Sequence, residues 1–414
     1  MGNQPTLFIQ RTQLLNGINT VGKALRSVGL DPFRLDADDI IEKATRKAGY
    51  AGRLPRAEEG IHRMVRSVNE EAMPNPFGAM AVKRLLERSL YNRFKVEQHM
   101  ALHPEIEQAP ISEPVFIIGM PRTGTTILHA LLHQDPAHRS PLAWECLLPY
   151  PPHSPETFEN NEQLATIRKE FSQLFKLVPD FLRKHYMAAD SPQECLGIDA
   201  LDFNTFQLSA QLYVPSYMDW VADGADRLAT MRFHKRFLQY LQSGGVTGER
   251  WLLKSPVHLM RLPELFEVYP DARIIMTHRD PTNVVTSTAS LISSVRSLYS
   301  DHENPCRTGH EQLDIWSLYH KRFLKSRARL NKEDCIIDLK FDDFAKDQIG
   351  TVKKIYDRFG WEFSDIALVH FKEFLIQNPK DKNGVHYYTP ETFGLTKEMI
   401  HKEFTEYNEF LSRL

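Results

Sequence analysis

The stretch Val115-Phe-Ile-Ile-Gly-Met-Pro-Arg-Thr-Gly-Thr-Thr126 decides the fold of this chain. It begins with the apolar run 115–118, which is typical of a strand buried in a parallel sheet, and it continues after Gly124 as a helical pattern. Between the two, Gly119 and Gly124 have the G-x-x-x-x-G spacing of a phosphate-binding loop. Glycines there let backbone N–H groups and the helix N-terminus converge on an anion. The stretch therefore predicts a strand, an anion-binding loop and a helix.

Two positions in the loop indicate which anion it binds. Thr125 stands where an ATP-binding loop has its lysine, and Arg122 supplies a cation inside the loop instead. The usual contact to β- and γ-phosphates is therefore missing. We expect a shorter group, such as a 5′-phosphate that carries one further transferable unit.

Three more short apolar runs, at 251–253, 272–277 and 335–339, alternate with helical patterns. This alternation predicts an α/β fold with a P-loop-like, three-layer core, in which helices cover both faces of a parallel sheet. Lys254 and Arg279 follow two of these runs, and Ser287 lies eight residues beyond Arg279. Because ligands bind outside the carboxyl ends of parallel strands, we expect these side chains to lie near the loop.

Outside the core, the pattern is helical. Residues 1–110 contain amphipathic runs at 38–48, 56–72 and 80–99, and they predict a helical N-terminal region without a sheet. The core is expected to span 111–414, with a helical insertion at about 155–240 and a terminal helix at 395–414.

Composition excludes several classes of protein. The chain has 414 residues with 51 basic and 53 acidic ones, so the basic excess of a general nucleic-acid binder is absent. No apolar run is long enough for a transmembrane helix, and the N-terminus lacks a signal-peptide pattern, so we expect a cytoplasmic protein. The four cysteines match no zinc or redox spacing. Gly2 and Thr6 fit an N-myristoylation pattern too short to outweigh coincidence.

The three motifs together resemble those of a known family. The segment 121–126 resembles the 5′-phosphosulfate loop of sulfotransferases that use 3′-phosphoadenosine 5′-phosphosulfate (PAPS), and Arg279 with Ser287 resembles their 3′-phosphate site. Lys254-Ser255-Pro256 resembles the catalytic-lysine segment of the branch that includes tyrosylprotein sulfotransferases and many bacterial enzymes. The cytosolic branch has a catalytic histidine where this chain has Pro256, so that role is not carried over.

This resemblance implies a PAPS-dependent sulfotransferase. It implies that the donor is held by Arg122, Thr123, Gly124, Thr125, Thr126, Arg279 and Ser287. Lys382, in a polar C-terminal loop, is a further candidate for the 3′-phosphate. Arg122 and Lys254 would stabilise the transferred group and the leaving oxygen. Glu145 is the expected base, because it lies 23 residues after Arg122, close to where the tyrosylprotein branch has its catalytic glutamate.

His258, four residues after Lys254, is the rival candidate for the base. His129 and His133 have the i,i+4 spacing of metal ligands, but no third ligand accompanies them, so no metal is expected.

The acceptor is open at this point. Aromatic residues between 203 and 220 have a spacing that favours core packing, and the resemblance would put them near the acceptor pocket. We therefore expect a hydroxyl acceptor that is small or lipid-like, with apolar or aromatic character. Two alternatives remain: a P-loop-type small-molecule kinase, and a catalytically idle nucleotide-binding module. The sequence gives no indication of the oligomeric state.

Overall fold

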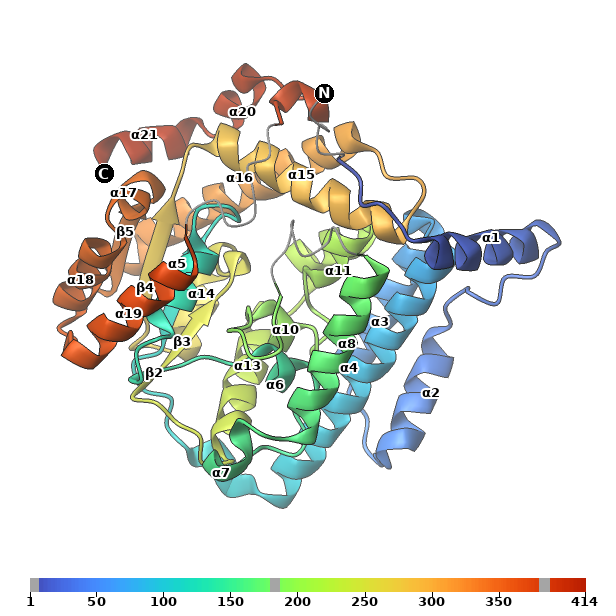
Figure 1. Cartoon of the computed structure of the whole chain (residues 1–414), viewed down its shortest axis with the longest axis horizontal. Coiled ribbons are helices and arrows are strands. Elements are labelled where there is room, and N and C mark those ends of the chain that lie inside the picture. The colour runs from blue at the N-terminus through green and yellow to red at the C-terminus, as the bar shows by residue number, and fades with distance from the viewer. Residues whose placement is uncertain (1–6, 179–186, 380–387) are drawn as a thin grey trace.

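In the computed structural model, which describes residues 7–178, 187–379 and 388–414, a parallel five-stranded sheet forms the core (Figure 1). Its order is β2-β3-β1-β4-β5. The strands are β1 (Val115–Gly119), β2 (His138–Arg139), β3 (Arg250–Lys254), β4 (Arg273–His278) and β5 (Ile336–Lys340). The four predicted strands are confirmed. The edge strand β2 was not predicted, because two residues are too few to carry an apolar pattern.

Each strand of the core contributes side chains to both faces of the sheet. Val115 and Ile117 of β1 pack on one face, and Phe116 and Ile118 pack on the other. The first face is covered by α5 (Thr125–Leu132), α17 (Phe341–Lys346), α18 (Gln348–Phe359) and α19 (Asp365–Gln377). The second is covered by α13 (Arg227–Gln242), α14 (Leu262–Val268), α15 (Pro281–Tyr299) and α16 (Pro305–Leu330). This is the predicted three-layer arrangement, and it explains why β1 is apolar throughout.

The strand order places a switch point at β1. The chain continues from β1 to the β2 edge and back through β3, and then crosses to β4 on the other side of β1. In such sheets the crevice that binds ligands lies outside the carboxyl ends of the strands at the switch. The loop after β1 and the residues after β3 and β4 therefore meet there.

The N-terminal region is helical, as predicted, and contains one helix more than the three predicted runs. Its elements are α1 (Gln13–Ser27), α2 (Ala37–Ala48), α3 (Pro55–Ser67), the π-helix η1 (Val68–Ala72), α4 (Pro76–Leu102) and the 3₁₀-helix η2 (Pro104–Gln108). Helices α2 to α4 share a buried apolar cluster with Phe203, Leu208 and Tyr217 of the insertion. In Figure 1 these blue helices lie on the side of the molecule away from β5.

The insertion and the C-terminus are also helical. The elements of the insertion are α7 (Pro155–Phe158), α8 (Glu162–Leu177), α10 (Leu196–Asp199), α11 (Gln207–Gln211), α12 (Pro215–Asp219) and η3 (Trp220–Gly224), before α13. The last residues form two helices, α20 (Lys397–Glu403) and α21 (Thr405–Arg413), where a single one was expected. No helix in the three described ranges is both long and apolar enough to cross a membrane.

Buried histidines make the fold sensitive to acid. Burial lowers the pKa of His234 and of His320 from 6.5 to about 3. Below pH 6.5 the unfolded chain binds protons that the folded chain does not, so stability falls as the pH falls. We expect each of the two to cost about 2 kcal/mol between pH 7 and pH 5. Asp199, whose pKa burial raises to about 6, offsets part of this loss.

Urea unfolding at the two pH values measures the effect. An unfolding free energy that is equal or higher at pH 5 would contradict it. His62, an exposed histidine with 46% of its side chain accessible, provides the control: a His62→Gln variant should show the same pH dependence as the parent chain.

Candidate active site

The loop between β1 and α5 has the backbone geometry of an anion cradle. Gly119 (φ 146°) and Gly124 (φ 86°) both lie in the region that favours glycine, and Arg122 has φ 68°. A Cβ on Gly119 would lie 2.4 Å from Thr277 Oγ1 and 2.7 Å from its carbonyl oxygen, so no side chain fits there. A non-glycine residue with positive φ costs free energy and marks functional loops. The predicted strand, loop and helix are all present, and the bends come at the predicted glycines.

The threonines of the loop have different surroundings. Thr123 is buried, its hydroxyl donates to Met120 O at 2.7 Å, and it lies 2.6 Å from Thr277 Oγ1. Its side chain therefore fixes the loop against β4. Thr125 is buried as well, whereas Thr126 is exposed at the first turn of α5. Of these three threonines, Thr126 has the exposed side chain, so we expect Thr123 and Thr125 to contribute through the loop backbone.

Arg122, Arg279 and Ser287 come together, as predicted. Arg122 Nε donates to Ser287 Oγ at 3.0 Å, and Arg279 Nη1 donates to the Arg122 carbonyl at 2.9 Å. The Arg279 guanidinium lies over the Phe341 ring, 4.2 Å from its centroid. Among the residues that the structure describes, neither guanidinium forms a salt bridge with a carboxylate.

The charge of Arg279 also acts on Arg122. Desolvation and the like charge of Arg279 lower the pKa of Arg122, and desolvation lowers that of Arg279. Two neighbouring cations that form no salt bridge among the described residues favour the binding of an anion.

Lys254 lies at the carboxyl end of β3, next to the loop. Its side chain is only 3% exposed, and its ammonium is 3.5 Å from Thr126 Oγ1. The ammonium also donates to Glu194, whose carboxylate is 29% exposed. Glu194 was missed in the sequence because it lies 60 residues before Lys254, in no motif, so only the fold pairs them.

The side chain of Glu145, the predicted base, is buried. This residue is part of α6 (Ala143–Leu147), and its side chain is 5% exposed. One carboxylate oxygen accepts from the Arg139 guanidinium and the other from Leu142 N–H at 2.9 Å. Both oxygens therefore hold structural contacts. Its role as the base stays a prediction.

His258, the rival base, is fully buried in the 3₁₀-helix η4 (Pro256–Leu259). Its Nδ1 accepts from Arg261 Nε at 3.2 Å, and its ring meets Phe116 edge-on at 5.0 Å. Burial, with the charge of Arg261, lowers its pKa well below 6.5. The structure thus places His258 in the core under the sheet and does not bring it to the loop.

The structure also shows the surroundings of the candidate metal ligands. His129 Nε2 lies 3.2 Å from Ser140 Oγ and 3.3 Å from Leu252 O, so this buried ring has structural partners. Within the described ranges, Cys195, His234 and His258 come nearest to a ligand set, with ligand atoms within 4.8 Å of one another. Because Arg261 donates to Nδ1 of His258, the neutral ring carries its hydrogen on Nε2, which disfavours a cation there.

Two predictions fall outside the described residues: Lys382 as a ligand of the 3′-phosphate, and Gly2 as a modification site. The aromatic residues of the insertion are described. Phe203 and Tyr217 are buried, and the Tyr217 hydroxyl donates to Phe203 O at 2.9 Å. They belong to the core, which is what their spacing favours.

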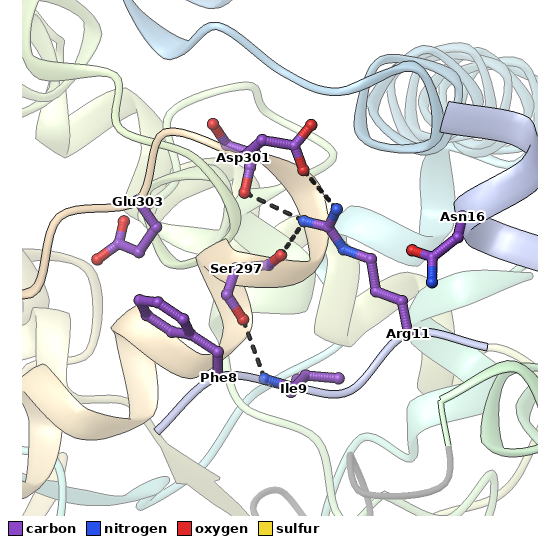
Figure 2. A pocket seen from close by; sticks show the side chains of 8 residues that line it. Phe8, Ile9, Arg11, Asn16, Ser297, Asp301 and Glu303 are labelled. Atoms are coloured by element: carbon purple, nitrogen blue, oxygen red, sulfur yellow. Dashed lines mark hydrogen bonds and ion pairs between the residues drawn. The ribbon is translucent and has the colours of Figure 1, made fainter. Parts of the chain in front are cut away.

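A hollow of about 330 Å³ lies elsewhere, at the C-terminal end of α15 (Figure 2). The Arg11 guanidinium contacts Asp301 and the Ser297 carbonyl there, and Ile9 N donates to Ser297 Oγ at 3.1 Å. These contacts attach the N-terminal segment to α15, and they pair most of the polar groups that line the hollow. None of the glycine-loop residues lines this hollow, so the hollow and the loop are separate sites on the structure.

Known proteins of one family are similar to this chain. Residues 114–365 match the model of the sulfotransferase family. An omega-hydroxy-beta-dihydromenaquinone-9 sulfotransferase of Mycobacterium bovis, Stf3, is 25% identical over 293 residues, which cover 69% of this chain and 72% of the relative.

Two solved structures resemble the whole fold. The sulfotransferase STF1 of Mycobacterium tuberculosis is 29% identical, with a TM-score of 0.80, over 90% of this chain and 99% of that one. STF9 of Mycobacterium avium is 30% identical, with a TM-score of 0.82, over 90% and 96%.

Proposed function

The chain belongs to the sulfotransferase family, and from this premise we propose that it transfers a sulfuryl group from PAPS to a hydroxyl of an apolar, lipid-like acceptor. The observation that carries the choice of donor is the convergence of Arg122, Arg279 and Ser287 beside the glycine loop. It provides a second anion site beyond the loop. PAPS has a 3′-phosphate for that second site, and ADP and ATP have none.

The residues present fit this donor. The positive φ of Gly119 and Gly124 leaves room for an anion against the loop amides, and the two guanidiniums lack carboxylate partners among the described residues. The donor supplies the activated sulfuryl group. Arg122 and the loop would hold its 5′ end, and Arg279 with Ser287 its 3′-phosphate. The ammonium of Lys254 would face the oxygen that leaves, because Lys254 approaches the loop at Thr126.

The proposal of a lipid-like acceptor is based on the substrate in one relative's name and on the net charge of this chain. Stf3 is named for an omega-hydroxylated dihydromenaquinone. The chain has 51 basic and 53 acidic residues, so it lacks the excess of positive charge that would favour a polyanionic acceptor. Incubation with ³⁵S-labelled PAPS and a panel of prenyl, steroid and sugar alcohols tests this proposal. Label should enter the prenyl or steroid alcohols; label in sugar alcohols alone would contradict it.

The donor assignment leads to a binding prediction. Adenosine 3′,5′-bisphosphate should raise the melting temperature more than ADP does, because tighter binding to the folded state stabilises it more. The Arg279→Ala variant should bind the bisphosphate about 10- to 100-fold more weakly, since a hydrogen bond to a charged group contributes about 1.5–3 kcal/mol. Its affinity for ADP should hardly change. Isothermal titration calorimetry measures both affinities.

Arg273→Ala is the matched control. Arg273 is the first residue of β4, and Arg279 directly follows the last one. Arg273 therefore lies at the opposite edge of the sheet from Arg279, where it pairs with Glu113. This variant should bind the bisphosphate like the parent chain. Equal temperature shifts with both nucleotides, or equal losses in the two variants, would contradict the assignment of the 3′-phosphate site.

A further inference from the structure

The contact between Lys254 and Glu194 bears on how the acceptor is activated. We propose that Glu194 is the base that takes the proton of the acceptor hydroxyl, and that binding of the donor frees it from Lys254. This inference rests on the proposed function. It assigns the base role to a residue with no sequence motif, in place of Glu145.

The first argument is position. Glu194 accepts a hydrogen bond from the Lys254 ammonium, which we place at the leaving oxygen. Only the Lys254 ammonium therefore separates this carboxylate from the proposed position of the reacting atoms. The backbone on both sides of it is fixed: Cys195 N donates to Lys254 O at 2.9 Å, and Gln193 N donates to Pro141 O at 2.8 Å. Because backbone hydrogen bonds hold the residues on both sides of Glu194, its carboxylate can keep the position relative to the acceptor hydroxyl that proton transfer requires.

The second argument is access. The side chain of Glu194 is 29% exposed, whereas that of Glu145 is 5% exposed. Of the two carboxylate oxygens of Glu194, only Oε1 has a hydrogen-bond partner in the described part of the chain, and this partner is Lys254. Glu145 uses both oxygens, for Arg139 and for Leu142 N–H. A hydroxyl can therefore approach Glu194 without breaking a structural contact, and it cannot approach Glu145 in that way.

The third argument is charge. While Glu194 pairs with Lys254, the ammonium occupies its Oε1 and balances its negative charge. The donor brings negative oxygens into the loop beside the same ammonium. When Lys254 turns to them, Glu194 loses this partner, and its Oε1 can accept the proton of the acceptor hydroxyl. The pair thus makes activation of the acceptor depend on a bound donor, and this would limit wasteful reaction with water.

The step balances without a further reactant. The proton of the acceptor hydroxyl moves to Glu194, and the acceptor oxygen forms a bond to sulfur. The bond between sulfur and the bridging oxygen breaks, and its electron pair stays on the 5′-phosphate, next to the Lys254 ammonium. Glu194 then releases its proton to solvent and pairs with Lys254 again.

The test compares Glu194→Gln with Glu145→Gln, using ³⁵S-labelled PAPS, farnesol as the first prenyl alcohol, and adenosine 3′,5′-bisphosphate for calorimetry. We expect Glu194→Gln to lower kcat about 10²- to 10⁴-fold, the usual range for loss of a general base. The acidic limb of its pH–rate profile should disappear. Its bisphosphate affinity should equal or exceed that of the parent chain, because the uncharged amide no longer competes for Lys254.

Glu194→Asp should recover part of the rate, since it restores a carboxylate with a shorter reach. Glu249→Gln, an exposed glutamate beside Arg250, is the matched control and should keep full activity. A kcat of Glu194→Gln within threefold of the parent would overturn the inference. So would a fall in kcat accompanied by tenfold weaker bisphosphate binding, or a loss of activity in Glu145→Gln alone with unchanged melting. If the parent chain labels no alcohol in the panel, the proposed function itself fails, and this inference fails with it.

Discussion

Replacing Lys254 with methionine is expected to lower kcat for sulfuryl transfer by about 10³-fold, with little change in bisphosphate affinity. Methionine has nearly the length of lysine but no charge, so the leaving oxygen would lose its cation in the transition state. Loss of one group that stabilises developing charge typically costs about 10²- to 10³-fold in kcat. We place this effect at the upper end because Lys254 is a full charge and is only 3% exposed.

Lys340→Met provides the control. Lys340 ends β5, so it lies at the same edge of the sheet, and its side chain is exposed. Steady-state rates with ³⁵S-labelled PAPS and calorimetry with the bisphosphate separate the two expected effects. Equal kcat in the two variants would remove Lys254 from the mechanism. A tenfold loss of bisphosphate affinity in Lys254→Met alone would make its role one of binding.

Replacing Asp202 with alanine is expected to lower the free energy of unfolding by about 3–5 kcal/mol, the usual cost of removing one partner of a buried ion pair. Asp202 is 1% exposed and accepts from Arg93 of α4 at 2.8 Å, from Arg56 of α3, and from Thr230 of α13 at 2.8 Å. The alanine would leave the Arg93 guanidinium buried without its carboxylate.

This variant also tests how the chain is divided. Because Asp202 joins α3 and α4 to the insertion and α13, we propose that residues 1–110 and the core unfold together. Urea denaturation followed by fluorescence and by circular dichroism should show one transition in both signals, at a lower midpoint. Asp223→Ala, which removes an exposed partner of Arg322, should change stability by less than about 0.5 kcal/mol. Two separated transitions in the parent chain would contradict a single unit.

The local features of the phosphate loop could be predicted because their causes are local. The positive φ at Gly119 and Gly124 requires glycine, and the alternating faces of β1 require apolar residues throughout. The helix start at Asp280-Pro281 is of the same kind: the Asp280 side chain accepts from Thr282 N, and Pro281 is the first residue of α15. None of these depends on a distant residue.

Elements with weaker local patterns were not predicted. Strand β2 has two residues and is held only by its pairing with β3. Helix α1 was overlooked, and it leaves Leu14 and Val21 exposed, so its apolar residues do not all lie on one buried face. For such elements, tertiary contacts determine the conformation, and their sequence alone does not.

The partners of the charged groups depend on the fold as a whole. Glu145 and His258 were candidates by their spacing from Arg122 and Lys254, yet the first is paired with Arg139 and the second is buried under the sheet. Glu194 lies in no motif, but it contacts Lys254 across 60 residues of sequence. Burial and ion pairing depend on which segments pack together, and spacing along the chain does not specify this.

The sequence by itself thus determined the α/β core, the anion-binding loop and the strand ends that carry Lys254 and Arg279. These follow from hydrophobic periodicity and from backbone preferences, which act over a few residues. Only the tertiary structure decided which carboxylate stands beside Lys254 and which are held in structural pairs. The reason is physical: the basicity of a side chain depends on the charges and the solvent around it, and the folded chain assembles those surroundings from distant segments.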